Sequence, residues 1–143
     1  MFDDRFPVEL VEGVPVVATP EEIDITNAEA LRSALLTAAA NGHRTLVVDL
    51  TQTQFCDSSA LHTLLAAHKR AQAEGRQVLL VMASPPVLLV FALTGIDHMI
   101  PSFTSLPEAL AQTGGRDHQL SPARELITSE AGQGNRRGSA SAL

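Results

Sequence analysis

Residues 45–83, TLVVDLTQTQFCDSSALHTLLAAHKRAQAEGRQVLLVMA, determine the fold that the sequence predicts. Two short apolar runs, at 45–50 and 77–83, have the composition of strands that are covered on both faces. Between them, residues 58–74 carry apolar side chains at helical spacing. A strand, a helix and a second buried strand form a parallel βαβ unit. This stretch therefore predicts an α/β domain.

The residues before this unit predict a hairpin and a helix. VELVE and VPVVAT flank Gly13, which is typical of two short antiparallel strands joined by a tight turn. The run at 27–41 has apolar residues at helical spacing, and Thr26 with Glu29 matches the capping-box pattern. We expect the chain to open with two strands followed by one helix.

The residues after the unit predict three more elements. PPVLLVFALTG, at 85–95, predicts a helix whose two prolines occupy the first turn, where a missing N–H costs little. A short edge strand near 98–101 and a final helix at 106–112 follow. Three glycines follow helical runs and predict left-handed caps: Gly42, Gly75 and Gly95. The predicted order is β-β-α-β-α-β-α-β-α, a small mixed sheet of about four to five strands flanked by about four helices.

Charge and glycine content divide the chain near residue 113. Residues 1–113 hold 6 basic and 13 acidic side chains, whereas 114–143 hold 4 basic, 3 acidic and five of the nine glycines. The last thirty residues lack sustained apolar periodicity and predict a largely disordered tail, with a short helix near 121–129 as the alternative for that segment. The folded part carries a net charge of −7, which disfavours direct binding to nucleic acid or to an anionic membrane.

The start of the chain and its single cysteine favour a cytoplasmic location. MFDDRFPVEL contains acids and a proline and has no apolar signal-peptide core. No run approaches the roughly 18 apolar residues of a membrane span. One cysteine excludes a disulfide framework and fits a reducing compartment.

The turn before the central helix is where the sequence places its chemistry. Asp57 is suited to cap the helix by accepting from the N–H groups of Ser59 or Ala60. Ser58 and Ser59 then lie in the first turn, where the helix dipole favours an anion. The same pattern also serves as a plain cap without function. A helical wheel puts Ser58 beside the apolar stripe and Ser59 nearly opposite, so local chemistry leaves the choice of serine open.

Three segments together resemble the STAS-domain anti-sigma factor antagonists. They are FCDSSALHTLLAAHKRA with VVDL before it, EEIDITNAEAL, and LTGIDHMIPSFTSLPEAL. The resemblance covers about residues 8–112 and implies a mixed sheet flanked by helices. Two positions depart from the family pattern: Thr-Pro-Glu stands where Gly usually precedes the glutamate of the second segment, and Ala60 replaces a commoner Gly.

The resemblance implies a switch controlled by phosphorylation. In such proteins the serine directly after the aspartate is phosphorylated by a partner anti-sigma factor that is a serine kinase, which corresponds here to Ser58, with Ser59 as the alternative. A Ser/Thr phosphatase resets the switch. The implied partner-binding residues are Glu22, Asp24, Asp57, Ser58, Ser59 and Ala60. The alternative is a STAS scaffold or ligand-sensing module in a stress-signalling complex.

Enzymatic and metal-binding functions fit the sequence less well. The serines lack a G-x-S-x-G elbow, and Asp57 beside them cannot act as the third member of a catalytic triad. As a receiver-type phospho-acceptor, Asp57 would need an all-parallel repeat and a late lysine, whereas the chain opens with a hairpin and has only Lys69. His62 and His68 are six residues apart and do not share a helical face. We expect His68 to be a hydrogen-bonded core histidine and Cys56 to pack as a small apolar side chain. We expect no catalytic residue, no metal and no cofactor.

Overall fold

The sheet begins with an antiparallel hairpin at the N-terminus. The computed structural model describes residues 5–40 and 42–113. Strand β1 (Val8–Val11) pairs antiparallel with β2 (Val14–Ala18). Glu12 and Gly13 between them have φ of 54° and 83°. Positive φ at both central residues is the mark of a type I′ turn, which matches the twist of paired strands. The predicted hairpin is confirmed.

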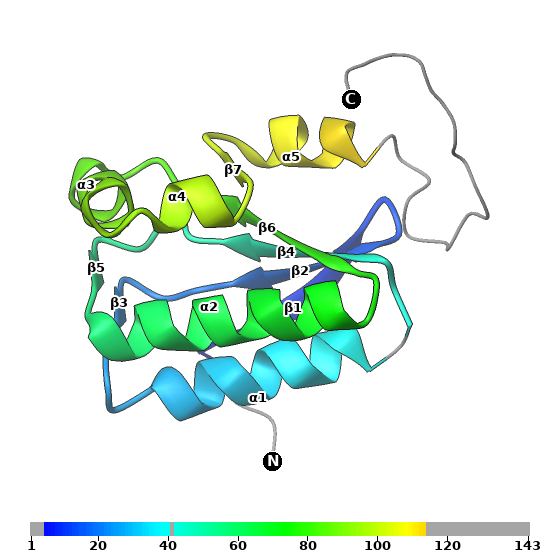
Figure 1. The fold of residues 1–143 in the computed structure, drawn as a ribbon, viewed down its shortest axis with the longest axis horizontal. Helices are drawn as coiled ribbons and strands as arrows, with labels where there is room; N and C mark the ends of the chain where they lie inside the picture. Colours follow the sequence, from blue (N-terminus) through cyan, green and yellow to red (C-terminus); the bar gives the residue numbers. More distant parts are fainter. Residues whose placement is uncertain (1–4, 41, 114–143) are drawn as a thin grey trace.

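Four of the strands run parallel and carry the helices between them. The later elements are β3 (Glu22–Ile23), α1 (Ala28–Ala39), β4 (Thr45–Asp49), β5 (Phe55–Cys56), α2 (Ser58–Ala73), β6 (Gln77–Val81), α3 (Pro85–Thr94), α4 (Ile96–Met99), β7 (Ser102–Phe103) and α5 (Leu106–Gln112). The main sheet has the order β1-β2-β4-β6-β7, with β2, β4, β6 and β7 parallel (Figure 1). The predicted α/β mixed sheet is confirmed, and so is its central βαβ unit β4–α2–β6.

Side chains of the central strands alternate between two apolar cores. In β6, Leu80 packs into the core under α1, α2 and α3, while Leu79 and Val81 pack with Ala109 and Leu110 of α5. Helices α1 and α2 cover one face of the sheet and α5 lies over the other (Figure 1). Because both faces are covered, the middle of the central strands is continuously apolar, at 46–48 in β4 and 78–81 in β6.

The position predicted for the edge strand, near 98–101, is wrong. Residues 96–99 form the short helix α4, and the strand β7 begins at Ser102. Gly95, with φ of 79°, ends α3 and accepts from the N–H of His98, so the chain turns once more before it extends. Pro101 cannot donate, but its carbonyl accepts from Leu80 N at 2.9 Å and leads the chain into β7. Positive φ is also found at the other two predicted cap glycines, Gly42 and Gly75.

The capping box predicted from Thr26 and Glu29 is also wrong. Helix α1 starts at Ala28 after Asn27, which makes no side-chain cap. The Thr26 hydroxyl instead donates to the Asp24 carboxylate at 2.5 Å, and the Glu29 carboxylate pairs with Arg32 at 3.3 Å. Asp24 therefore competes successfully for the threonine, as short acidic side chains do in local turns.

Some predictions fall outside what the structure describes. The tail predicted for residues 114–143, and the helix considered near 121–129, lie among residues that are not described. Within 5–40 and 42–113, none of the helices combines the length and the apolar character needed to cross a bilayer.

His68 is buried in the core on the inner face of α2. Its side chain is 7% exposed, and its Nδ1 atom finds no hydrogen-bond partner among the described residues. The sequence predicts a hydrogen-bonded core histidine; the burial is confirmed, but Nδ1 has no partner there. Burial, followed by the nearby charge of Lys69, lowers the pKa of His68 below its ordinary value. The folded protein therefore holds this imidazole neutral.

We predict that His68 makes the folded state less stable in acid. An unfolded chain binds a proton on His68 below a pH of about 6.5, while the folded chain resists it. Above that pH, His68 is neutral in both states and does not lower the free energy of unfolding. As the pH falls from about 6.5 toward the lowered folded pKa, the free energy of unfolding decreases by no more than about 1.4 kcal/mol per pH unit. Urea denaturation between pH 7.5 and 5 should show a shallower pH dependence for His68→Gln than for wild type. His62→Gln, an exposed position on the same helix, is the control and should follow wild type; equal slopes for all three proteins would contradict the prediction.

Candidate functional site

Two loops at one end of the sheet are joined by a small second sheet. Strands β3 and β5 pair in parallel, with Glu22 opposite Phe55 and Ile23 opposite Cys56. Gln54 N donates to the Glu21 carbonyl at 2.7 Å beside this pair. Each strand has only two residues, so no sequence period predicts them. The pairing brings the predicted Glu-Ile-Asp segment against the residues that lead into the serine turn.

Residues 19–21, Thr-Pro-Glu, differ from the family pattern and are hydrogen-bonded to the loop between β4 and β5. Thr19 is 4% exposed, and its hydroxyl lies 2.5 Å from that of Thr53. Thr53 in turn donates to the Pro20 carbonyl at 2.6 Å. Two buried threonines therefore hold the proline segment in place where the family pattern has a glycine.

Asp57 connects the two loops through its carboxylate. Its Oδ1 accepts from Ser59 N at 2.8 Å and Ala60 N at 3.2 Å, which caps α2 as predicted. Its Oδ2 accepts from Ile25 N at 3.1 Å. Asp57 N also donates to the Ile23 carbonyl at 3.1 Å. One side chain thus caps the helix and tethers the acidic loop beside it.

The acidic loop is held in a single conformation by short-range hydrogen bonds. Asp24 accepts from Thr26 N at 2.9 Å, and Asn27 Oδ1 accepts from Asp24 N at 2.9 Å. Asn27 Nδ2 donates to the Glu22 carbonyl at 2.9 Å. The Thr26 hydroxyl, as the largest cause, lowers the pKa of Asp24, so the carboxylate is ionised at neutral pH. Glu22 is exposed, Asp24 is half-buried, and the loop presents negative charge.

The exposure of the two serines is the reverse of what the helical wheel suggests. Ser58 is exposed and Ser59 is half-buried. The buried positions of α2 are Ala60, Leu64 and His68, while Leu61 and Leu65 are only half-buried. The buried stripe is therefore centred farther from Ser58 than the leucine spacing suggested, because Ala60 joins the core. Of the two hydroxyls, that of Ser58 is the more accessible.

Ser58 and Ser59 line an open, shallow depression between the first turns of α1 and α2. Its other lining residues are Ile25, Ala28, Glu29, His62 and Thr63. This lining set contains no lysine or arginine. Arg32 lies in the neighbouring depression, which shares His62 and Thr63 with this one, and makes an exposed ion pair with Glu29. A dianion on Ser58 would therefore find carboxylates and one histidine around it.

Five of the six residues predicted for partner binding are brought together at this surface. Glu22, Asp24 and Asp57 lie on the two joined loops, and both serines follow directly. Ala60 is the exception, because it is 0% exposed and its methyl group packs in the core. Sequence reasoning missed Ile25, which is 76% exposed between the acids. A single apolar residue in a polar loop was the signal available for it.

The cysteine before the serine turn is buried and unreactive. Cys56 is 5% exposed, and burial, followed by the charge of Asp57, raises the pKa of its thiol to about 12. It packs as a small apolar side chain, as predicted. In the part of the chain that the structure describes, no three His, Cys, Asp or Glu side chains gather as metal ligands would.

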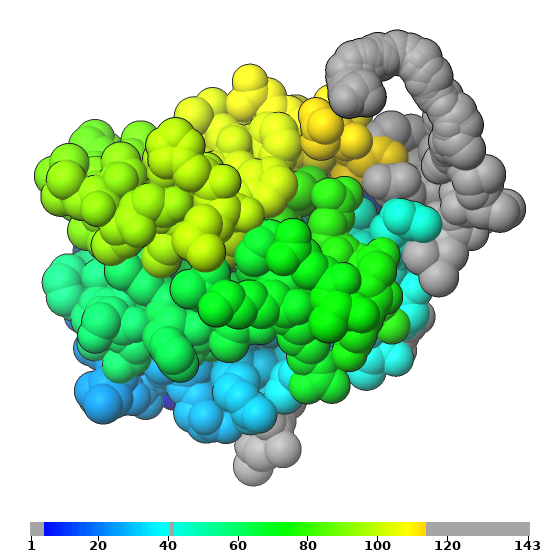
Figure 2. All heavy atoms as spheres, viewed as in Figure 1, coloured from blue at the N-terminus to red at the C-terminus, as the bar shows by residue number. Residues whose placement is uncertain are grey.

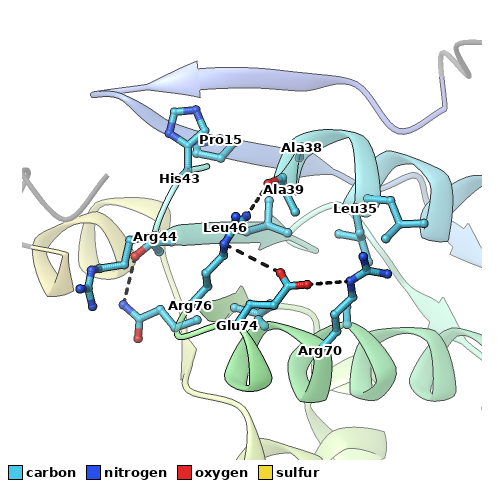
Figure 3. Close-up of a pocket in the computed structure, with 16 residues that line it drawn as sticks. Pro15, Leu35, Ala38, Ala39, His43, Arg44, Leu46, Arg70, Glu74 and Arg76 are labelled. Carbon is cyan, nitrogen blue, oxygen red and sulfur yellow. Dashed lines mark hydrogen bonds and ion pairs between the residues drawn. The ribbon is translucent and has the colours of Figure 1, made fainter. Parts of the chain in front are cut away.

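A second pocket lies at the opposite end of α2, near the start of β4 and β6. Figure 3 shows its cationic side chains meeting Glu74: Arg70 Nε lies 3.2 Å from its Oε2, and Arg76 Nε lies 3.9 Å from its Oε1. Arg76 also donates to the Ala39 carbonyl at the end of α1. The free volume is about 50 Å³, which holds a few waters and not a metabolite. Arg70 and Arg76 are engaged within the fold, whereas the Nε of Arg44 in the same pocket has no hydrogen-bond partner among the described residues. Because the pocket is too small for a metabolite, the serine turn remains the candidate site.

Comparisons with known proteins agree on one family. A family model described as STAS domain matches residues 5–109. A Thermotoga neapolitana homolog of TM1081, named as a candidate anti-sigma factor antagonist, is 25% identical over 112 residues, which span 78% of this chain and 99% of that protein.

Solved structures show the same fold. The chain is similar to an anti-sigma factor antagonist from Mycobacterium paratuberculosis at 32% identity and a TM-score of 0.69, covering 75% of this chain and 91% of the other. It is also similar to unphosphorylated SpoIIAA, an anti-sigma factor antagonist, at 23% identity and a TM-score of 0.65, covering 77% and 96%. Bacillus SpoIIAA in its phosphorylated form matches at a TM-score of 0.59 and 23% identity, covering 76% and 98%. At this identity the likeness to SpoIIAA concerns the fold alone.

Proposed function

We propose that this chain, which belongs to the STAS domain family, frees a sigma factor by binding an anti-sigma factor. The proposal rests on its resemblance to the anti-sigma factor antagonists of that family. In this proposal the unphosphorylated form binds. The anti-sigma factor is a serine kinase that phosphorylates Ser58 and thereby ends the contact. A Ser/Thr phosphatase restores the binding form. The chain itself acts by binding in the cytoplasm and not by catalysis.

The exposed position of Ser58 at the start of α2, directly after the Asp57 cap, is the observation that supports this proposal most directly. A kinase needs an exposed hydroxyl, and Ser58 is exposed while Ser59 is half-buried. Proteins with a similar fold include SpoIIAA, which has been solved in both an unphosphorylated and a phosphorylated form. That pair supports the idea that a fold of this kind tolerates the modification.

The energetics favour a change in binding over a change in folding. Phosphorylation adds about −1.5 to −2 charges at neutral pH. In the free protein the phosphate stays in water at the N-terminus of α2, which stabilises an anion by about 0.3–1 kcal/mol. Under a docked partner the same charge would be buried beside Asp57 and near Asp24. An unpaired buried charge costs about 2–5 kcal/mol, which is a loss of affinity of about thirtyfold to several thousandfold.

Mapping the phosphate tests the assignment of the serine. The protein would be incubated with ATP and each purified kinase-type anti-sigma factor of its source organism, and the product mapped by mass spectrometry. We expect one phosphate on Ser58, lost in Ser58→Ala and retained in Ser59→Ala. Incorporation that persists in Ser58→Ala and disappears in Ser59→Ala would move the site by one residue. Neither phosphorylation nor binding with any of these kinases would overturn the proposed function.

A further inference from the structure

Helix α3 is apolar all round, yet most of it faces solvent. Only Val87 and Phe91 of its ten residues are buried. Leu88, Leu89 and Leu93 are 36%, 58% and 77% exposed. A helix that is apolar on every side is normally enclosed on every side. The outward side of α3 therefore lacks a cover among the described residues.

The exposed leucines belong to a larger apolar patch. Phe55 of β5, 52% exposed, and Met99 of α4, 47% exposed, lie on the two elements that pack against α3. We call these side chains the α3 patch: Phe55, Leu88, Leu89, Leu93 and Met99. It holds five of the seven large apolar side chains that are exposed in the described part of the chain. Contiguous apolar surface of this kind marks interaction sites on soluble proteins.

The α3 patch is continuous with the serine turn. Phe55 stands two residues before Asp57 and pairs across β3–β5 with Glu22. The Ser84 hydroxyl at the start of α3 donates to Gln54 Oε1 at 3.1 Å, which ties the helix to the same loop. In Figure 1 α3, β5 and the first turn of α2 lie at one end of the molecule, and Figure 2 shows the yellow-green atoms of α3 and α4 at the surface there.

Charge at the patch selects the kind of partner. Residues 84–96, SPPVLLVFALTGI, carry no ionisable side chain, so nothing in α3 opposes burial. The adjoining rim carries Glu21 and Glu22, with Asp24 beyond them. Two copies of this chain meeting symmetrically through the patch would bring equivalent rims together, and each copy has a net charge of −6. A partner with an apolar centre and a basic rim complements this surface better.

From this continuity and charge we propose that the α3 patch is the second half of the anti-sigma factor contact, covered by an apolar surface of that partner whose basic rim faces Glu21 and Glu22. This inference rests on the proposed function and deepens it. The patch supplies the affinity through burial of apolar surface, and the serine turn supplies the control. The division follows from the energies, since apolar burial is insensitive to phosphate whereas the acidic turn is not.

The double variant Leu89→Ser with Leu93→Ser tests the patch. Both side chains point outward, and Val87 and Phe91 still hold the helix to the core, so the variant should keep its fold by circular dichroism. Affinity for the purified anti-sigma factor that phosphorylates the wild-type protein would be measured by calorimetry. We expect a loss of about 100-fold for the pair, because each leucine leaving an apolar contact weakens binding about tenfold. Leu10→Ser is the matched control: Leu10 is 62% exposed on β1, outside the patch, and should bind as wild type.

Each outcome decides the inference separately from the proposed function. If the double variant binds with wild-type affinity while Ser58→Asp abolishes binding, the α3 patch is not part of the contact and the proposed phosphorylation switch is retained. A variant that unfolds is replaced by Met99→Ser with Leu89→Ser, measured in the same way. Light scattering tests whether the patch binds a second copy of this chain instead. A wild-type dimer that these substitutions convert to a monomer would assign the patch to a second copy and overturn the proposal. Wild-type protein that binds no anti-sigma factor would sink the proposed function and this inference together.

Discussion

Ser58→Asp is expected to fold normally and to bind the anti-sigma factor about thirtyfold to several thousandfold more weakly than wild type. Aspartate places a permanent negative charge in the exposed first turn of α2. In the free protein that charge is solvated, and the helix N-terminus stabilises it by about 0.3–1 kcal/mol. In the complex it is buried near Asp57 without a counter-ion. Calorimetric titration of the partner, alongside urea denaturation of the free protein, measures both quantities.

Ser58→Asn separates charge from shape in this experiment. Asparagine has the size of aspartate but no charge, so it should bind within about tenfold of wild type. Ser59→Asp puts the same charge one residue away, at a half-buried position. Its affinity for the partner shows how strongly the loss of binding depends on the position of the charge. Equal affinities for Ser58→Asp and Ser58→Asn would rule out an electrostatic switch.

Asp57→Ala is expected to lower the free energy of unfolding by about 1–2 kcal/mol and to release the acidic loop. The carboxylate caps α2 through Ser59 N and Ala60 N, and loss of such a cap costs about 0.5–2 kcal/mol. It also holds Ile25 N at 3.1 Å. Without it, the loop loses its tether at Ile25, while the β3–β5 pairing and the backbone bond from Asp57 N to the Ile23 carbonyl remain. Urea denaturation measures the stability, and amide hydrogen exchange measures the release.

Asp57→Asn distinguishes the cap from the tether. Asparagine caps a helix about as well as aspartate, but its amide nitrogen would face the Ile25 N–H and cannot accept from it. Exchange at Ile25 should therefore accelerate in both variants, while exchange at Ser59 and Ala60 should accelerate only in Asp57→Ala. Unchanged exchange at Ile25 in both proteins would show that the loop does not depend on Asp57.

The main sheet was predictable because its signals are local. Two buried strands around an amphipathic helix, a glycine turn in the hairpin and an aspartate before α2 each act within a few residues. The structure confirms the mixed sheet, the βαβ unit and the Asp57 cap on those grounds. The STAS resemblance over residues 8–112 agrees with the family match over residues 5–109.

The joining of the two loops was implied by the family resemblance and by no local sequence signal, because it depends on contacts between distant residues. Ile25 and Asp57 are 32 positions apart, and β3 and β5 are too short to show a period. The helical wheel placed Ser58 beside the apolar stripe because it followed the leucines, whereas the buried positions of α2 are Ala60, Leu64 and His68. The exposure of α3 was hidden for a similar reason: a helix that is apolar on every side carries no pattern that shows which side meets the core.

The inert thiol of Cys56 sets a limit on what the turn can sense. Peroxides and disulfides react with thiolates, and with a pKa of about 12 only about one molecule in 10⁵ carries the thiolate at neutral pH. A sulfur two residues from the regulated hydroxyl is thereby kept out of redox chemistry. Oxidants that modify exposed cysteines elsewhere in the cell would leave this thiol untouched, so the switch proposed at Ser58 would not respond to them through Cys56.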